Sequence, residues 1–446
     1  MADSVAVLPA LSFAEKVEEV ATFLAHQLPG TDNERQAWLQ SVRESITTVA
    51  PEQEEGSEEQ VVPELSQERK EAVVDKLVKT SVELNGGLEA AERDVESAHL
   101  VFQSLLMTGF EAAEYERRYE QVVQSVGKGA ASASSRARVE AALRVLIHSY
   151  NLAPIDSKLR PTILLAALRV LSASDYLDVT ALPLPIAVIE QSVSAWSLSS
   201  SEKSEWLQQV ADVYESAKTT TPAGTTTSLK ETALQLRVLA LVVGQGGDAK
   251  AVDAALASAL KIETTYDLVP VLKVQGARDG MSGEMKELVR LFEENVELGE
   301  CLSWVQGHDA FLSGLGLSAE DVTRKLRLLA LVSLCAGSQN RDIPYSEVVS
   351  TLNVEEDLVE AWVIDAIHAN LLKARLSQPK KTLRVQSVAS RAFGQGEWSL
   401  LEKRLGEWRA TLEDVQGVVA DAMKRDHHDA AYAGGRRRKN EAQVEA

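Results

Sequence analysis

Apolar residues return every three or four positions through most of the chain, which is the period of an amphipathic helix. One such segment carries Val139, Leu143, Leu146 and Ile147. Short turns that contain glycine, such as 246–248, separate successive segments. Helix hairpins that stack on one another produce this alternation. We therefore expect a mainly α fold with a solenoid-like helical-repeat array, although the sequence has no fixed repeat period.

Polar or small-residue stretches interrupt the array. Residues 53–60 carry four glutamates and no large apolar side chain, so we expect 51–62 to form an acidic disordered loop. The small-residue stretch 127–135 and the threonine-rich stretch 219–228 are predicted as further breaks, the second as a linker. These breaks predict N-terminal helices at 1–50, helical repeats at 63–218 and a further helical part at 229–317.

The pattern changes after the helical part. A short helix is predicted from Tyr345 to Leu352, followed by a tight turn and a longer helix at about 355–370. Two β-like runs, 371–376 and 382–388, are joined by a turn that contains proline and lysine. Helices followed by a hairpin predict a winged helix at 318–391.

The last predicted helix, 392–423, has the most regular spacing in the chain. Its apolar positions step alternately by three and four residues, as in a coiled-coil seam. The seam consists of Trp398, Leu401, Leu405, Trp408, Leu412, Val415 and Val419. So narrow a stripe favours pairing with a helix of another subunit, while packing on the winged helix of the same chain is the alternative. Residues 424–446 are predicted as a disordered basic tail.

The charge balance limits the function classes. The chain has 46 basic and 66 acidic residues, a formal net charge of -20, which opposes the footprint of a general nucleic-acid binder. Its two cysteines, Cys301 and Cys335, stand apart in apolar stretches and are typical of reduced core thiols. With no basic leader and no long apolar run, we expect a cytoplasmic protein without a membrane segment.

The predicted hairpin departs from this acidic balance. It carries six cations without an acid: Lys373, Arg375, Lys380, Lys381, Arg384 and Arg391. These charges either protect an edge strand from aggregation or contact ribosomal RNA or an acidic neighbour. The helix at 355–370, in contrast, has an acidic exposed stripe that disfavours it as a groove-binding recognition helix.

Motifs for catalysis are weak. Gly244–Ala249 fits the pattern GxGxxA, but it follows an amphipathic helix, so a helix-hairpin turn is favoured over a dinucleotide site. The histidines form no zinc-ligating cluster, and neither a nucleophile elbow nor a Walker A loop is present. We predict a chain that is not an enzyme and takes no cofactor, metal or small-molecule substrate.

A family resemblance rests on four phrases of sequence. They are Lys325–Leu329, Val359–Ile367, Arg391–Gly394 and Glu397–Leu401. With them the segment from about 266 to 415 resembles the PCI domain, and within that group it is similar to the m-subunit family of eukaryotic translation initiation factor 3. The resemblance implies a PCI domain at 229–391, made of a helical part and a winged helix.

The resemblance also implies a function. Members of this family are non-catalytic scaffolds, so the expected partners are other PCI and MPN subunits of the factor and the small ribosomal subunit, in mRNA recruitment. PCI winged helices associate through their sheet edges, so Val385 is expected in a strand shared with a neighbour. A scaffold subunit of the COP9 signalosome or the proteasome lid is the alternative, and a winged-helix nucleic-acid binder is a third possibility.

Overall fold

The structure is a computed structural model. It describes residues 11–46, 65–133, 135–173, 185–217, 223–246, 248–337, 342–389 and 395–444. The predicted acidic loop at 51–62 lies outside the described residues. The chain divides into two compact units: unit 1 comprises residues 1–288 and 308–319, and unit 2 comprises residues 289–307 and 320–446.

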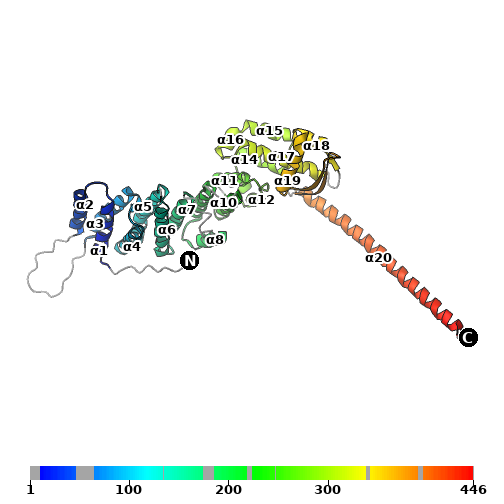
Figure 1. Cartoon of the computed structure of the whole chain (residues 1–446), viewed down its shortest axis with the longest axis horizontal. Coiled ribbons are helices and arrows are strands. Elements are labelled where there is room, and N and C mark those ends of the chain that lie inside the picture. Colours follow the sequence, from blue (N-terminus) through cyan, green and yellow to red (C-terminus); the bar gives the residue numbers. More distant parts are fainter. Residues whose placement is uncertain are drawn as a thin grey trace, which may run out of the picture. The chain divides into compact units, whose positions relative to one another are not determined.

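Unit 1 is a row of helices (Figure 1). Its first part consists of α1 (Phe13–Gln27), α2 (Asp32–Ile46), α3 (Gln67–Glu83), the 3-10 turn η1 (Asn85–Gly87), α4 (Glu92–Gly109), α5 (Ala112–Ala131), α6 (Arg136–Leu152) and α7 (Leu159–Ala173). Its second part consists of α8 (Ile186–Ala195), α9 (Ser200–Ser216), α10 (Ala223–Val243), α11 (Ala249–Lys261), α12 (Val269–Leu272), α13 (Ala277–Gly280) and α16 (Asp309–Gly314). Helix α14 (Gly283–Glu293) spans the boundary between the units.

Helices in unit 1 pack on their neighbours and on the helix two places further along the chain. Helix α4 contacts α6, α5 contacts α7, and α7 contacts α9. In repeat proteins each hairpin buries its apolar face against the next hairpin in the same way. The mainly α, helical-repeat character predicted from the sequence is confirmed.

Polar side chains join these helices inside the core. The amide nitrogen of the buried Gln103 donates to the hydroxyl of Tyr115 at 3.0 Å and to the carbonyl of Ser149 at 3.1 Å, which links α4, α5 and α6. Further along the chain, the Trp206 indole nitrogen donates to the Pro161 carbonyl at 2.8 Å. Buried polar groups that find such partners fix how one helix lies on the next.

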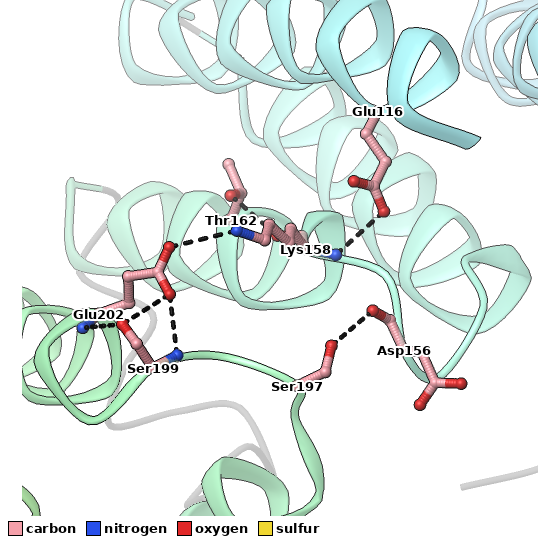
Figure 2. Close-up of polar contacts among 7 residues, drawn as sticks. All are labelled: Glu116, Asp156, Lys158, Thr162, Ser197, Ser199 and Glu202. Carbon is pink, nitrogen blue, oxygen red and sulfur yellow. Dashed lines mark hydrogen bonds and ion pairs between the residues drawn. The ribbon is translucent and has the colours of Figure 1, made fainter. Parts of the chain in front are cut away.

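The connecting loops of unit 1 are also tied together (Figure 2). The backbone nitrogen of Lys158, before α7, donates to Glu116 of α5 at 3.1 Å, and its ammonium lies 3.3 Å from Glu202 of α9. Glu202 closes a capping box with Ser199. The backbone and hydroxyl hydrogen bonds from Ser199, together with Lys158, lower the pKa of Glu202 to about 2.

Unit 2 contains the winged helix. Its elements are α15 (Leu298–Gly307), α17 (Ala319–Gly337), β1 (Asp342–Pro344), α18 (Tyr345–Leu352), the 3-10 turn η2 (Glu356–Leu358), α19 (Val359–His368), β2 (Leu372–Ser377), β3 (Thr382–Val388) and α20 (Gln395–Val444). The three strands form an antiparallel sheet in the order β1-β3-β2. The predicted winged helix is therefore present, with a first strand that the sequence analysis did not predict.

Three predicted boundaries need correction. Helix α10 begins at Ala223, inside the predicted linker 219–228. Helix α5 runs to Ala131, through much of the predicted break at 127–135. Helix α20 continues to Val444, through the tail predicted as disordered.

Candidate protein-interaction surfaces

The seam of α20 is exposed along its whole length. The exposed fractions are 61% for Trp398, 37% for Leu401, 53% for Leu405, 71% for Trp408, 60% for Leu412, 53% for Val415 and 50% for Val419. Every side chain from residue 401 to residue 423 is exposed. Aligned exposed apolar side chains on a helix are typical of a surface that another helix covers.

Two exposed apolar residues next to the seam were missed by the sequence analysis. Val418 is 70% exposed and Met423 is 64% exposed. Val418 lies beside the seam residue Val419, and Met423 follows Val419 one helical turn later, so the apolar stripe is wider at this end than a strict coiled-coil seam. The signal was present in the sequence, because both are apolar residues within one turn of Val419.

The wing leaves the described cations among the predicted set exposed to solvent. Lys373 and Arg375 in β2, Lys380 in the turn, and Lys381 and Arg384 are exposed, whereas Arg391 lies outside the described residues. The pairing of Arg375 with Arg384 across β2 and β3 places two guanidinium-bearing residues side by side. Opposite them, Leu383 of β3 points into the core.

Two of these cations are engaged within unit 2. The Arg384 guanidinium donates to both carboxylate oxygens of Asp342 in β1, at 2.7 and 3.2 Å, which lowers the pKa of Asp342 and raises that of Arg384. The Lys381 ammonium lies 2.8 Å from Glu356 of η2, whose hydrogen bond raises the pKa of Lys381. Within the described part of the wing, the exposed cations left for an outside anion are Lys373, Arg375 and Lys380.

The expectation for Val385 needs correction. Val385 is 1% exposed, and its strand β3 is the middle strand, paired with β1 on one side and β2 on the other. Its side chain belongs to the core, and its backbone already lies between two strands of the same sheet. In the described sheet, β2 and β1 are the edges, and β1 is only three residues long and ends at Pro344.

Two carboxylates of the acidic stripe of α19, those of Glu360 and Asp365, have hydrogen-bond or ion-pair partners within unit 2. Glu360 accepts hydrogen bonds from the Tyr345 hydroxyl at 3.2 Å and from Gln378 of the wing turn at 2.7 Å. Asp365 pairs with Arg324 of α17 at 2.8 Å. The wing turn is thus fastened to the helix that would enter a DNA groove, and the carboxylates there would repel phosphates.

Comparison with known proteins gives two matching families. The PCI domain family matches residues 305–387, and the family described as the C-terminal helix of eIF3 subunit M matches residues 391–419. Relatives named eukaryotic translation initiation factor 3 subunit M match from several organisms. The protein of Aspergillus terreus is 27% identical over 435 residues, which cover 93% of this chain and 87% of the relative.

Two further relatives carry the same name. The protein of Neosartorya fischeri is 28% identical over 383 residues, 84% of this chain and 78% of the relative. That of Dictyostelium discoideum is 33% identical over 156 residues, 35% of this chain and 38% of the relative.

The chain is similar to the PCI domain family over residues 305–387, and it resembles subunit M of eukaryotic translation initiation factor 3 over most of its length. The match to the C-terminal helix family ends at Val419, which is also the last residue of the seam. The PCI match covers the acidic helix α19 and the sheet except for Val388, the last residue of β3. Both candidate surfaces therefore lie inside the matched segments.

We searched the described part of the chain for metal-ligating clusters and reactive thiols. There, no group of three or more His, Cys, Asp or Glu side chains is placed to hold a metal ion. Burial raises the pKa of the Cys335 thiol to about 12, which keeps it protonated and unreactive. Among the described helices, none is both long enough and apolar enough to cross a membrane.

Proposed function

We propose that the chain is a non-catalytic, cytoplasmic scaffold subunit of eukaryotic translation initiation factor 3, supporting assembly on the small ribosomal subunit and mRNA recruitment. The observation that supports this most directly is the exposed seam of α20, inside the segment that matches the C-terminal helix of eIF3 subunit M. The partners are the other PCI and MPN subunits of the factor. The mechanism is assembly, not catalysis.

The seam supplies the energy for this assembly. A Leu or Trp side chain that is half exposed gains roughly 1 kcal/mol when a partner covers the rest of its apolar surface. Seven such side chains in one line give a partner helix several kcal/mol before the cost of association is subtracted. The exposed helix therefore contributes to attachment, and further contacts must offset the rest of the cost of association.

The wing is the second surface in this proposal. Lys373, Arg375 and Lys380 face outward and fit either an acidic neighbouring subunit or ribosomal RNA. If a neighbour extends the sheet, it does so along β2, because β3 is already paired on both sides. Engagement through β2 would leave the ion pairs of Lys381 and Arg384 intact.

The test replaces two seam leucines in the full chain. Leu405→Asp with Leu412→Asp places two carboxylates in the seam, where burial against a partner costs several kcal/mol. The matched control, Ser399→Asp with Ala410→Asp, adds the same charges on the opposite side of α20. We expect the seam variant to lose the initiation factor subunits and small ribosomal subunits that co-purify with the tagged wild type and the control.

Three outcomes would contradict the proposal. Recovery of isopeptidase-complex subunits or ATPase rings with the wild-type chain would favour the COP9 signalosome or the proteasome lid. Equal recovery of initiation factor subunits by both variants would remove the seam as an assembly surface. A lower melting temperature of the isolated seam variant relative to its control would indicate that the seam packs on its own chain.

A further inference from the structure

The charges beside the seam specify how α20 can pair. In heptad terms, Trp398, Leu405, Leu412 and Val419 occupy the a positions, and Leu401, Trp408 and Val415 occupy the d positions. Glu402 and Arg409 then fall at the e positions, and Arg404 and Thr411 fall at the g positions. All of these side chains are exposed, and Arg409 also pairs with Glu413 one turn further along the same helix at 2.9 Å. Such flanking charges set the partner and the orientation of a coiled coil.

Parallel pairing of two copies is disfavoured. In a parallel pair, a g residue of one helix faces the following e residue of the other. Arg404 would then lie against Arg409 of the second copy, on both sides of the pair. Like charges at these positions weaken the association.

Antiparallel pairing of two copies brings opposite charges together and gives each tryptophan a smaller side chain to pack against. When Leu405 lies opposite Trp408 of the second copy, Glu402 faces Arg409 twice, once on each side of the symmetry axis. In this register two further layers form, Trp398 opposite Val415 and Leu401 opposite Leu412, and Val419 lies beyond them with no seam residue opposite. Each tryptophan thus meets a smaller aliphatic side chain, which fills a core layer without overpacking.

Neighbouring registers do not share this advantage. A slip of one heptad in one direction places Glu402 against Glu402 and Arg404 against Arg404. A slip in the other direction places Arg409 against Arg409 at the centre of the pair. The charge pattern therefore selects a single antiparallel register.

We propose that the free chain self-associates through α20, antiparallel, in the register that faces Glu402 with Arg409 of a second copy. The self-associated form covers the seam that a partner helix would otherwise occupy, so the two kinds of pairing compete. This inference goes beyond the proposed function and does not depend on it, because it uses only the residues of α20.

A charge-reversal cycle on the purified full chain tests the inference. Sedimentation velocity over a wide range of protein concentration gives the dimer dissociation constant of each variant. Glu402→Arg and Arg409→Glu each replace two attractive pairs by two repulsive ones, and we expect each to weaken the dimer about tenfold at low salt. The double variant restores attraction with reversed signs and should return to the affinity of the wild type.

The control keeps the same chemistry on the outer side of the helix. Lys403→Glu with Glu407→Lys also exchanges one cation and one anion, at the f and c positions, and should leave the dissociation constant unchanged. A wild-type chain that stays monomeric at all concentrations would overturn the inference. Stronger dimerisation of Glu402→Arg, or single variants that dimerise as well as wild type, would overturn the antiparallel register.

The two proposals fail separately. A chain that dimerises as expected but recovers no initiation factor subunits contradicts only the proposed function. A chain that recovers those subunits but never dimerises contradicts only this inference. Competition is measured directly, because a partner helix that occupies the seam should lower the dimer fraction.

Discussion

Helices α5 and α20 are both amphipathic, but they differ in the width of the apolar face and in whether the chain itself buries that face. In α5 the apolar face is wide, and even the cation Arg118 is 4% exposed, held by Asp75 at 2.8 Å and by Glu114 at 3.0 Å. In α20 the apolar stripe is narrow, and Trp408 remains 71% exposed. A wide face indicates a helix that its own chain covers, whereas a strict three-four stripe indicates a helix prepared for a partner.

The largest expected effect compares one substitution in both regions. Leu105 of α4 is fully buried, so Leu105→Ala should cost about 3 kcal/mol of the free energy of unfolding and lower the melting temperature of unit 1 by several degrees. Leu405 of unit 2 is 53% exposed, so Leu405→Ala should leave the melting temperatures of both units unchanged in dilute protein. Thermal melts followed by circular dichroism check both. Equal losses would mean that the seam is covered by its own chain.

A second pair of substitutions should have opposite signs. A Cβ added at Gly129 of α5 would overlap the backbone oxygen of Asn85, so Gly129→Ala should destabilise unit 1 by about 2 kcal/mol. At Gly406 of α20 a Cβ meets nothing within 4 Å, so Gly406→Ala should raise helicity, with a gain of about 1 kcal/mol for that helix. Chemical denaturation and far-ultraviolet circular dichroism separate the two. A stabilising Gly129→Ala would contradict the close approach of η1 to α5.

Gly129 also shows where sequence reasoning stops. Small residues at 127–135 predicted a break, because glycine and alanine give no apolar period. The structure continues α5 to Ala131, and Gly129 is needed there because η1 approaches the helix closely. A glycine that permits close packing and one that ends a helix look alike in a single sequence. Only the tertiary contact distinguishes them.

In the wing, too, some elements follow from neighbouring residues, whereas others depend on residues far away in the sequence. The observed bounds of α18 and β3 equal the predicted ones, because the period of each is visible within a few residues. Strand β1 has three residues including a proline, and it becomes a strand only by pairing with β3 about forty positions away. The ion-pair partners of Arg384 and Lys381, which are Asp342 and Glu356, also stand far away in the sequence, so the sequence overstated the charge left for an outside partner.

The smallest expected effect is a pH dependence confined to unit 1. His99 of α4 is 3% exposed, and its Nε2 lies 2.7 Å from the carbonyl oxygen of Gly86. This contact is a hydrogen bond when the single proton of the neutral ring sits on Nε2. Its Nδ1 is buried without a hydrogen-bond partner among the described residues. Burial lowers the pKa of His99 in the folded state. The neutral ring is therefore the form that the core accepts.

The sign of the effect follows from proton linkage. Above pH about 6.5, the ordinary pKa of histidine, the side chain is neutral in both the folded and the unfolded chain, and His99 contributes no pH dependence. Below it the unfolded chain binds a proton that the folded chain does not, so the free energy of unfolding should fall by up to about 1.4 kcal/mol per pH unit. In His99→Gln, urea denaturation between pH 7.5 and pH 5.5 should lose this slope, whatever its absolute stability. Residues 398–423 contain no histidine, so the helical signal of α20 should stay constant over the same range. Parallel slopes for wild type and His99→Gln would show that another group controls the acid sensitivity of unit 1.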